Sequence, residues 1–195
     1  MKKTLIYLIL LLISLSIFSQ EKEATILFND STSIKGFGEI KNEKIYFRVD
    51  LKDEKSEWKS DMAKGLIFTG YGFSEKYEFV KPDKYSKPII MEVIEEGNVN
   101  LYRKSSYGLN ITGIGISTNG ISPVADYGFS NALYAKRANE ESATELTFSF
   151  KSRSLRYFSD CQIIIEKIKK REFKADTIIE MVYFYNDYCG KENED

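Results

Sequence analysis

Apolar residues recur at helical spacing in two stretches near the C-terminus, residues 161–168 and 178–189. In the first stretch they follow the i, i+3, i+4, i+7 spacing of one helical face, at Cys161, Ile164, Ile165 and Ile168. The second stretch has the same periodicity, with Ile178, Met181, Val182, Tyr185 and Cys189 on one face. We therefore predict two amphipathic helices, and we expect the link at residues 171–175 to reverse the chain between them.

Residues that favour helix ends border both stretches. Ser159 and Gln162 stand three positions apart, as in a capping box, and predict the start of the first helix. Asp176 is a favourable N-cap for the second helix, and Gly190 stands where that helix should end. Two tyrosines of the second helix are expected in the core and one at the surface: Tyr185 and Tyr188 inside, Tyr183 outside.

The only two cysteines, Cys161 and Cys189, lie at the start of the first predicted helix and at the end of the second. In an antiparallel helix pair both sulfurs reach the same end, which favours a disulfide. Two free thiols or a metal pair are the alternatives, and a chain without histidine makes a poor metal site. A disulfide indicates an oxidising compartment.

Between residues 24 and 150 apolar and polar residues alternate in short runs bounded by turn formers, the pattern of β-strands. The clearest run is residues 44–49. A single helical turn is expected at residues 60–65. The remaining candidate strands are residues 24–28, 33–40, a short piece around Trp58, 66–69, 76–80, 89–94, 99–103, 133–137 and 145–150. We predict an α+β fold, an antiparallel β meander (partial barrel or sandwich) followed by a C-terminal helical hairpin.

Residues 107–131 are rich in glycine and interrupt this rhythm. One interpretation is a hairpin that turns at Asn119-Gly120, a favourable pair for a two-residue turn. A long flexible loop is the second, and a lid over a ligand is the third. In the third case the contact residues would be Tyr107, Asn110, Asn119 and Tyr127.

The first twenty residues have the layout of a signal peptide. Lys2 and Lys3 precede an apolar run, residues 5–18, and Ser19 is small enough for the position before cleavage. We predict a leader at residues 1–20 and a single domain at 21–195, with a β-rich body at 24–150 and a helical tail at 151–190. The processed protein would be exported, periplasmic or secreted, without a membrane span.

Charge and composition narrow the function classes. The net charge is −1, and about −3 once the two lysines of the leader are removed, which gives no electrostatic footprint for nucleic acid or for an anionic membrane. The chain has no histidine, so catalysis that needs an imidazole is excluded. We expect no cofactor and no enzyme activity. The remaining catalytic hypothesis is a hydrolase with paired carboxylates, Asp50 or Asp53 with Glu95 or Glu96.

Three segments carry a resemblance: residues 133–137 (LYAKR), 157–161 (YFSDC) and 184–189 (FYNDYC). In these the chain resembles uncharacterised exported bacterial proteins with an aromatic-rich β body and a two-cysteine helical C-terminus. The resemblance implies no catalytic residue. The leading hypothesis is a non-enzymatic binding or structural module of the cell envelope, with an envelope protein as partner. The alternative is a small-ligand binder that uses residues 107–131 over a cavity in the β body.

Overall fold

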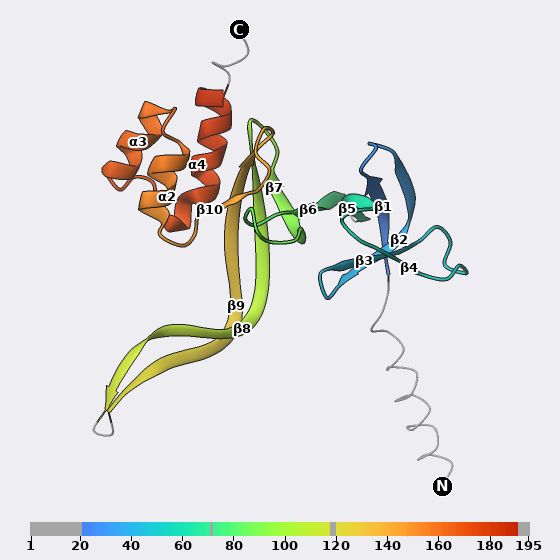
Figure 1. Cartoon of the computed structure of the whole chain (residues 1–195), viewed down its shortest axis with the longest axis horizontal. Helices are drawn as coiled ribbons and strands as arrows, with labels where there is room; N and C mark the ends of the chain where they lie inside the picture. Colours follow the sequence, from blue (N-terminus) through green and yellow to red (C-terminus); the bar gives the residue numbers. More distant parts are fainter. Residues whose placement is uncertain (1–20, 71, 118–119, 191–195) are drawn as a thin grey trace. The chain divides into compact units, whose positions relative to one another are not determined.

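The computed structural model describes residues 21–70, 72–117 and 120–190, and the predicted leader lies outside them. The chain forms two compact units, of which unit 1 runs to Ser74 and unit 2 begins at Glu75 (Figure 1). The fold class is α+β, as predicted, with antiparallel strands followed by C-terminal helices. The domain predicted for residues 21–195 thus comprises two units, which are described separately.

In unit 1 the strands are antiparallel, and β1 pairs with β2 on one side and with β5 on the other. Its strands are β1 (Lys22–Phe28), β2 (Ser33–Lys41), β3 (Lys44–Arg48), β4 (Ser56–Trp58) and β5 (Ala63–Gly70). They pair in the order β5-β1-β2-β3-β4. Asn42 and Glu43 join β2 to β3 with φ angles of 53° and 59°, as a two-residue hairpin turn requires. The predicted strands of this region are confirmed, because their alternation matches the buried and exposed faces of the sheet.

The core of unit 1 comes from alternating positions of β1, β3 and β5. The buried apolar residues are Ala24, Ile26, Ile45, Phe47, Ala63, Leu66 and Phe68. The helical turn predicted at residues 60–65 is only partly right. Ala63 N donates to Lys59 O at 2.9 Å and closes one turn, but β5 already begins at Ala63. Pairing with β1, which sets Leu66 opposite Ile26, overrides the local preference for a helix.

In unit 2 the strands are again antiparallel and are neighbours in the order β10-β9-β8-β7-β6. Its strands are β6 (Phe73–Val80, whose first two residues belong to unit 1), β7 (Ile89–Glu95), β8 (Val99–Ser117), β9 (Gly120–Arg137) and β10 (Thr144–Glu145). β8 and β9 are paired along their whole length (Figure 1). Of the three interpretations for residues 107–131, the backbone is therefore that of a hairpin. Of the two residues predicted for the turn, Gly120 belongs to β9 and pairs with Ser117, and Asn119 lies outside the described residues.

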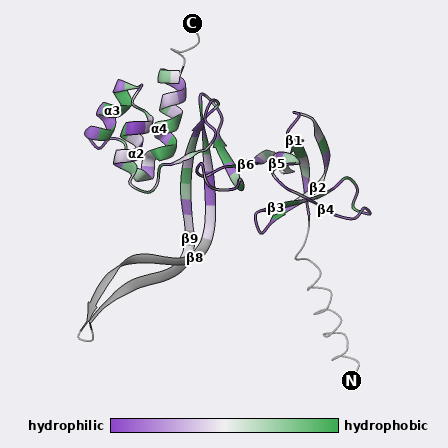
Figure 2. Cartoon of the chain, in the orientation of Figure 1, coloured by the Kyte–Doolittle hydropathy of each residue, from purple (hydrophilic) through white to green (hydrophobic). Residues whose placement is uncertain are grey.

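The helical end of unit 2 has more parts than predicted. It comprises α2 (Phe150–Tyr157), α3 (Gln162–Lys169), the 3-10 turn η2 (Ala175–Thr177), α4 (Ile178–Phe184) and the π-helical turn η3 (Tyr185–Cys189). The two predicted helices correspond to α3 and to α4 with η3. Figure 2 shows hydrophobic and hydrophilic residues side by side on these helices, as expected for elements with one buried face.

The strand predicted at residues 145–150 is wrong. Only Thr144–Glu145 pairs with β9, and α2 begins at Phe150. Ser149 adopts a left-handed conformation, φ 53°, and redirects the chain between the two elements. The alternating Leu146, Phe148 and Phe150 imitate a strand, but Leu146 is fully buried while Phe148 is 66% exposed at the surface.

One apolar core joins the helices to the sheet of unit 2. The sheet contributes Val99 and Leu101 of β8 and Ala135 of β9. The segment after β10 and the helical end contribute Leu146, Tyr157, Phe158, Cys161, Ile164, Ile168, Ile178, Met181, Val182 and Tyr185. The next position of β8 belongs instead to a smaller buried cluster, which consists of Val80, Met91, Tyr102 and Ala143. Both apolar stripes seen in the sequence thus face this core.

The helix ends differ from the predicted caps. α3 starts after Cys161, without a side-chain cap, so Ser159 does not cap it. Before α4 the backbone N–H of Lys174 donates to the Thr177 hydroxyl at 2.8 Å, and Asp176 lies inside the turn η2. Gly190 ends the last helix, as predicted, but in a right-handed conformation with φ −70°. Local sequence therefore marked these ends to within a few residues, whereas packing chose the terminal residue.

The disulfide prediction is confirmed. Cys161 and Cys189 are bonded, with an S–S distance of 2.03 Å and a Cα–Cα distance of 5.9 Å. The chain turns after α3 at Arg171, whose φ of 62° is left-handed. Tyr185 is buried and Tyr183 is 41% exposed, as predicted. The prediction that Tyr188 lies in the core is wrong, since its side chain is 65% exposed.

Candidate functional site

The densest polar cluster of unit 2 forms around Arg137, at the end of β9. Its guanidinium donates to both carboxylate oxygens of Asp160, at 3.0 and 3.1 Å, and to the Tyr157 carbonyl at 3.1 Å. It also donates to the Tyr185 hydroxyl at 3.2 Å, and that hydroxyl donates to Asp160 at 2.5 Å. Arg137 thereby connects the sheet with α2, with the turn before α3 and with the last helix.

Two aromatic rings enclose the same guanidinium. Its central carbon lies 4.5 Å from the ring centre of Tyr157 and 5.4 Å from that of Tyr185. Glu140 completes the cluster, because its Oε2 accepts from the Tyr157 hydroxyl and from the Arg137 backbone N–H, both at 2.8 Å. Charge-assisted hydrogen bonds and cation–π contacts of this kind hold elements in place.

The surroundings of the cluster raise the pKa values of its tyrosines and its arginine. Burial, followed by the hydrogen bond to Glu140, raises the pKa of Tyr157 above its ordinary value. Burial and the bond to Asp160 likewise raise the pKa of Tyr185. Burial acts to lower the pKa of Arg137, but its partners, Tyr185 first, outweigh burial and raise the pKa. Both phenols stay protonated near neutral pH, so neither is poised as a base, and the cluster serves to fasten the helices.

A second cluster lies on the other side of the sheet of unit 2. The Tyr102 hydroxyl donates to the buried carboxylate of Glu78 at 3.2 Å. Lys76 pairs with Glu78 at 3.0 Å and with Glu96 at 2.5 Å. Burial, and then the charge of Glu78, raises the pKa of Tyr102 to about 12. This cluster too is internally paired and joins β6 to β8.

In unit 1 the principal ion cluster surrounds Glu21, just before β1. Its carboxylate forms salt bridges with Arg48 at 2.7 Å and with Lys55 at 2.5 Å. Lys55 also forms a salt bridge with Glu39 at 3.0 Å. Burial by itself would raise the pKa of Glu21, but the hydrogen bonds from Lys55 and Arg48 outweigh it and lower the pKa. The cluster ties the start of the described chain to β2, β3 and the loop before β4.

The carboxylates of the hydrolase hypothesis fall in different units. Asp50 and Asp53 shape a loop of unit 1, where Asp50 accepts from Lys52 N and Asp53 from Asp50 N, both at 3.0 Å. Glu95 ends β7 in unit 2, and its neighbour Glu96 is bound to Lys76. The described contacts therefore give local structural partners to three of these carboxylates, and the hydrolase hypothesis gains no geometric support.

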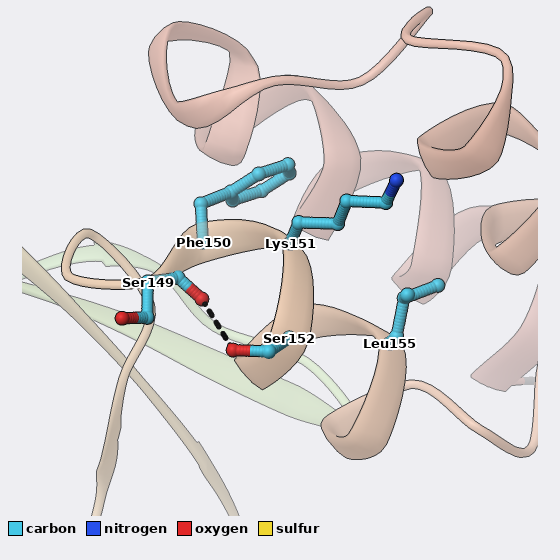
Figure 3. Close-up of a pocket in the computed structure, with 5 residues that line it drawn as sticks. All are labelled: Ser149, Phe150, Lys151, Ser152 and Leu155. Carbon is cyan, nitrogen blue, oxygen red and sulfur yellow. Dashed lines mark hydrogen bonds between the residues drawn. The ribbon is translucent and has the colours of Figure 1, made fainter.

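The described pockets are shallow and open. One lies beside the start of α2 and is lined by Ser149, Phe150, Lys151, Ser152 and Leu155, with the Ser152 hydroxyl donating to the Ser149 carbonyl at 3.1 Å (Figure 3). The other lies on unit 1 and is lined by Glu23, Ala24, Thr25, Lys35, Gly36, Phe37, Val49 and Thr69. Neither lining brings together a set of groups with catalytic chemistry.

The residues proposed as ligand contacts are divided between the two strands of the long hairpin. Tyr107 and Asn110 belong to β8 and Tyr127 to β9, whereas Asn119 lies outside the described residues. The register sets Leu109 opposite Tyr127 and Asn110 opposite Asp126. Since neighbouring positions of a strand alternate between faces, Tyr107 and Tyr127 share one face of the hairpin and Asn110 lies on the other. The three described residues of this set therefore lie on two different faces of the hairpin.

We call the outer part of the hairpin, residues 107–117 and 120–129, the arm. The register between its two strands places apolar residues on one face of the arm and mainly small or polar residues on the other. Starting from the pair Tyr107 and Phe129, one face collects apolar residues only: Tyr107, Leu109, Ile111, Ile114, Ile116, Ile121, Pro123, Ala125, Tyr127 and Phe129. We call this the apolar face. The opposite face holds small or polar residues and one valine: Gly108, Asn110, Gly113, Gly115, Ser117, Gly120, Ser122, Val124, Asp126 and Gly128.

A β-bulge makes this sorting possible. The register shifts between Ile111 and Gly113, so that Thr112 is an extra residue in β8. Without it, Ile114 and Ile116 would fall on the opposite face from Leu109 and Ile111. The apolar residues of β8 alternate on either side of Thr112, but the extra residue shifts this alternation by one position and makes it hard to recognise in the sequence. The glycines also favoured the interpretation as a loop. Only the cross-strand register reveals the continuous apolar face.

The arm begins where the ribbon is exposed on both of its faces. Ser105 donates to Asn131 at 2.8 Å on one face, and the Ser106 and Ser130 hydroxyls are 2.8 Å apart on the other. All four residues are exposed. Among the described strand pairings, β7 reaches β8 only as far as Arg103, and β10 reaches β9 only at Tyr134 and Ala135. Beyond these points the described pairing is that of a two-stranded ribbon.

No group of metal-ligating side chains occurs among the described residues. In that same part of the chain, the helices are too short or too polar to cross a lipid bilayer. Comparisons with protein-family models, with curated proteins and with solved structures give no match to this chain.

Proposed function

We propose that this chain is an exported, non-enzymatic binding module of the cell envelope, and that the arm is the element with which it binds. The observation that carries the proposal is the sorting of ten apolar residues onto one face of a ribbon that extends past its neighbouring strands. A long two-stranded ribbon is marginal by itself in water. The arm extends beyond the described pairings of β7 with β8 and of β10 with β9, so binding explains its length better than sheet formation does.

Export is supported by two independent features. The first is the leader-like segment at residues 1–20, with its two lysines, its apolar run and Ser19 before the expected cleavage point. The second is the disulfide between Cys161 and Cys189, which is stable in an oxidising compartment. The non-enzymatic part of the proposal is supported by the polar clusters around Arg137 and Tyr102, whose groups pair with one another and fasten structural elements.

The test is an armless variant that retains the rest of the chain. Residues 107–129 are replaced by Asn-Gly, which joins Ser106 to Ser130. These two serines are cross-strand partners, so a two-residue turn closes the shortened hairpin without changing its register. Wild-type and variant are expressed with the leader in the same bacterium, and the cells are separated into envelope and soluble fractions.

We expect the wild-type to be recovered with the envelope and the armless variant with the soluble material outside the cytoplasm. Formation of the disulfide, read by alkylation without reductant, checks that the variant is exported and folded. Recovery of the wild-type in the cytoplasm, or equal envelope association of the two chains, would overturn the proposal.

A further inference from the structure

We infer that the partner of the arm is a lipid surface, on which the apolar face of the arm lies. This inference rests on the proposed function and names the partner for it. The placement that carries it is the juxtaposition, in one ribbon, of an unbroken apolar face and an opposite face of small and polar residues. An element with this two-sided pattern lies in the membrane interface with its apolar side towards the acyl chains, as amphipathic helices do.

Charge distribution separates a lipid surface from an ordinary protein partner. Between Lys104 and Lys136 the only charged residue is Asp126, although charged residues make up 29% of the whole chain. Asp126 belongs to the face opposite the apolar one. Protein interfaces usually surround an apolar centre with a polar rim. An arm that lacks charged residues around its apolar face suits contact with hydrocarbon better than contact with a protein surface.

The order of residue types along the apolar face agrees with a membrane interface. Its three aromatic residues, Tyr107, Phe129 and Tyr127, lie at the end nearest the body of unit 2. Ile114, Ile116 and Ile121 occupy the outer end. Aromatic side chains concentrate at the level of the lipid headgroups, and aliphatic ones are preferred at greater depth. The arm thus has the order expected if its outer end enters deepest.

A second copy of this chain is the less favoured occupant. Eleven positions at about 3.4 Å each and two strands about 4.8 Å apart give a face of about 37 by 10 Å. Two such faces packed together would bury roughly 750 Å², less than the ~1,200 Å² at which stable interfaces begin. Contact with a lipid surface does not require the minimum buried area that a stable protein dimer requires.

Backbone hydrogen bonding limits the depth of insertion. The outward N–H and C=O groups of a two-stranded ribbon need partners, and the hydrocarbon core of a bilayer offers none. A single arm therefore lies shallowly, where water and headgroups reach its two edges. Binding should consequently depend on apolar contact rather than on the charge of the lipid.

The experiment is flotation of the full chain, isolated after export, with vesicles of phosphatidylcholine alone and with vesicles that also contain phosphatidylglycerol. We expect equal binding to both compositions, at low and at high salt, because no cation lies in the arm. The armless variant carries the same N-terminus, so it controls for any leader that is retained, and it should remain unbound.

Two matched substitutions on β9 test the assignment of faces. Ile121→Ser removes an apolar residue from the apolar face, and Val124→Ser removes one from the opposite face. We expect Ile121→Ser to weaken vesicle binding by about tenfold, since burying such a side chain contributes at least that factor. Val124→Ser should leave binding within about twofold of the wild-type. Hydrogen exchange in unit 2 verifies that both variants fold.

The outcomes separate this inference from the proposed function. If the wild-type needs its arm to remain with the cell envelope yet ignores both vesicles, the lipid partner is overturned while the envelope role stands. An arm-dependent dimer in sedimentation equilibrium, without vesicle binding, would replace lipid by a second copy. Equal losses from the two serine substitutions would overturn the assignment of faces. Arm-dependent flotation with the predicted difference supports the inference.

Discussion

The side chain of Asn186 pairs with both backbone groups of Val99. Its Nδ2 donates to the Val99 carbonyl at 3.0 Å, and its Oδ1 accepts from the Val99 N–H at 2.9 Å. Val99 is the first residue of β8 and fully buried, and β7 has already ended at this level. The amide thus substitutes for a neighbouring strand and joins the last helix to the sheet, 87 positions away in sequence.

Replacing Asn186 should therefore reduce the stability of unit 2 by more than the partial exposure of its side chain suggests. We expect Asn186→Ala to lower the free energy of unfolding of unit 2 by about 2–3 kcal/mol, because two buried backbone groups lose their partners. Hydrogen exchange followed by mass spectrometry should show faster exchange at Val99. Substitution of the exposed neighbour, Asp187→Ala, is the control, and an equal loss there would contradict the role of the amide.

Two glycines near this contact should respond differently to alanine. A Cβ on Gly97 would lie 2.5 Å from Asn186 Nδ2, and one on Gly190 would meet the side chain of Asn98. Asn98 is exposed and turns aside, whereas Asn186 is bound to Val99. We expect Gly97→Ala to destabilise unit 2 by about 1–3 kcal/mol and Gly190→Ala by less than about 1 kcal/mol. Thermal unfolding of the two variants compares them directly, and the reverse order would contradict this account.

Removing the disulfide should destabilise the helical end. It closes a loop with a sequence separation of 28, for which chain entropy predicts about 3–4 kcal/mol. We expect the double variant Cys161→Ala, Cys189→Ala to lose an amount in this range, seen as earlier exchange of α3 and α4 in denaturant. Alkylation of the wild-type without reductant should modify neither sulfur. Free labelling of both would disprove the bond.

Arg137 should not be replaceable by lysine. The lysine keeps the charge, but it loses the terminal guanidinium nitrogen that donates to Asp160 and to Tyr185, and the planar group over the rings of Tyr157 and Tyr185. We expect Arg137→Lys to destabilise unit 2 by about 1–3 kcal/mol. The exposed Arg156 provides the control, and Arg156→Lys should change the stability by less than about 0.5 kcal/mol. Similar effects of the two substitutions would contradict a fastening role.

Stability of unit 2 should fall in strong alkali because of Tyr102. Its pKa is about 12 in the folded chain against an ordinary value of 10.0, so folding favours the protonated phenol. The stabilisation is complete below pH 10 and declines by about 2–3 kcal/mol as the pH rises through 10 towards 12. The unfolding free energy of wild-type minus Tyr102→Phe should decrease over that interval.

The periodicity of apolar residues along the chain was sufficient to predict most strands and helices. The alternation around Ile45 and Phe47 predicted β3, because those side chains enter the core at every second position. The spacing of Ile164 and Ile168 predicted α3 for the corresponding reason with a period near 3.6. Failures came where local pattern and packing disagree, as at Phe148 and Phe150, which alternate like a strand at the start of α2.

The candidate site was only half visible in the sequence. Residues 107–131 stood out by their glycines, and Tyr107 and Tyr127 were selected with Asn110 as possible contacts. Which of these share a face depends on the register of β8 against β9 and on one extra residue, Thr112. A register spans two strands, so no pattern within a single strand could reveal it.

The sequence by itself determined the α+β class, the positions of most strands, the two apolar helices and the pairing of Cys161 with Cys189, because each follows from spacing along the chain. Tertiary structure alone decided that Arg137 is enclosed by Tyr157 and Tyr185, that Asn186 supports Val99 and that the arm has one wholly apolar face. The physical reason is distance along the chain: these contacts join residues far apart in sequence, whose encounter depends on how complete elements pack.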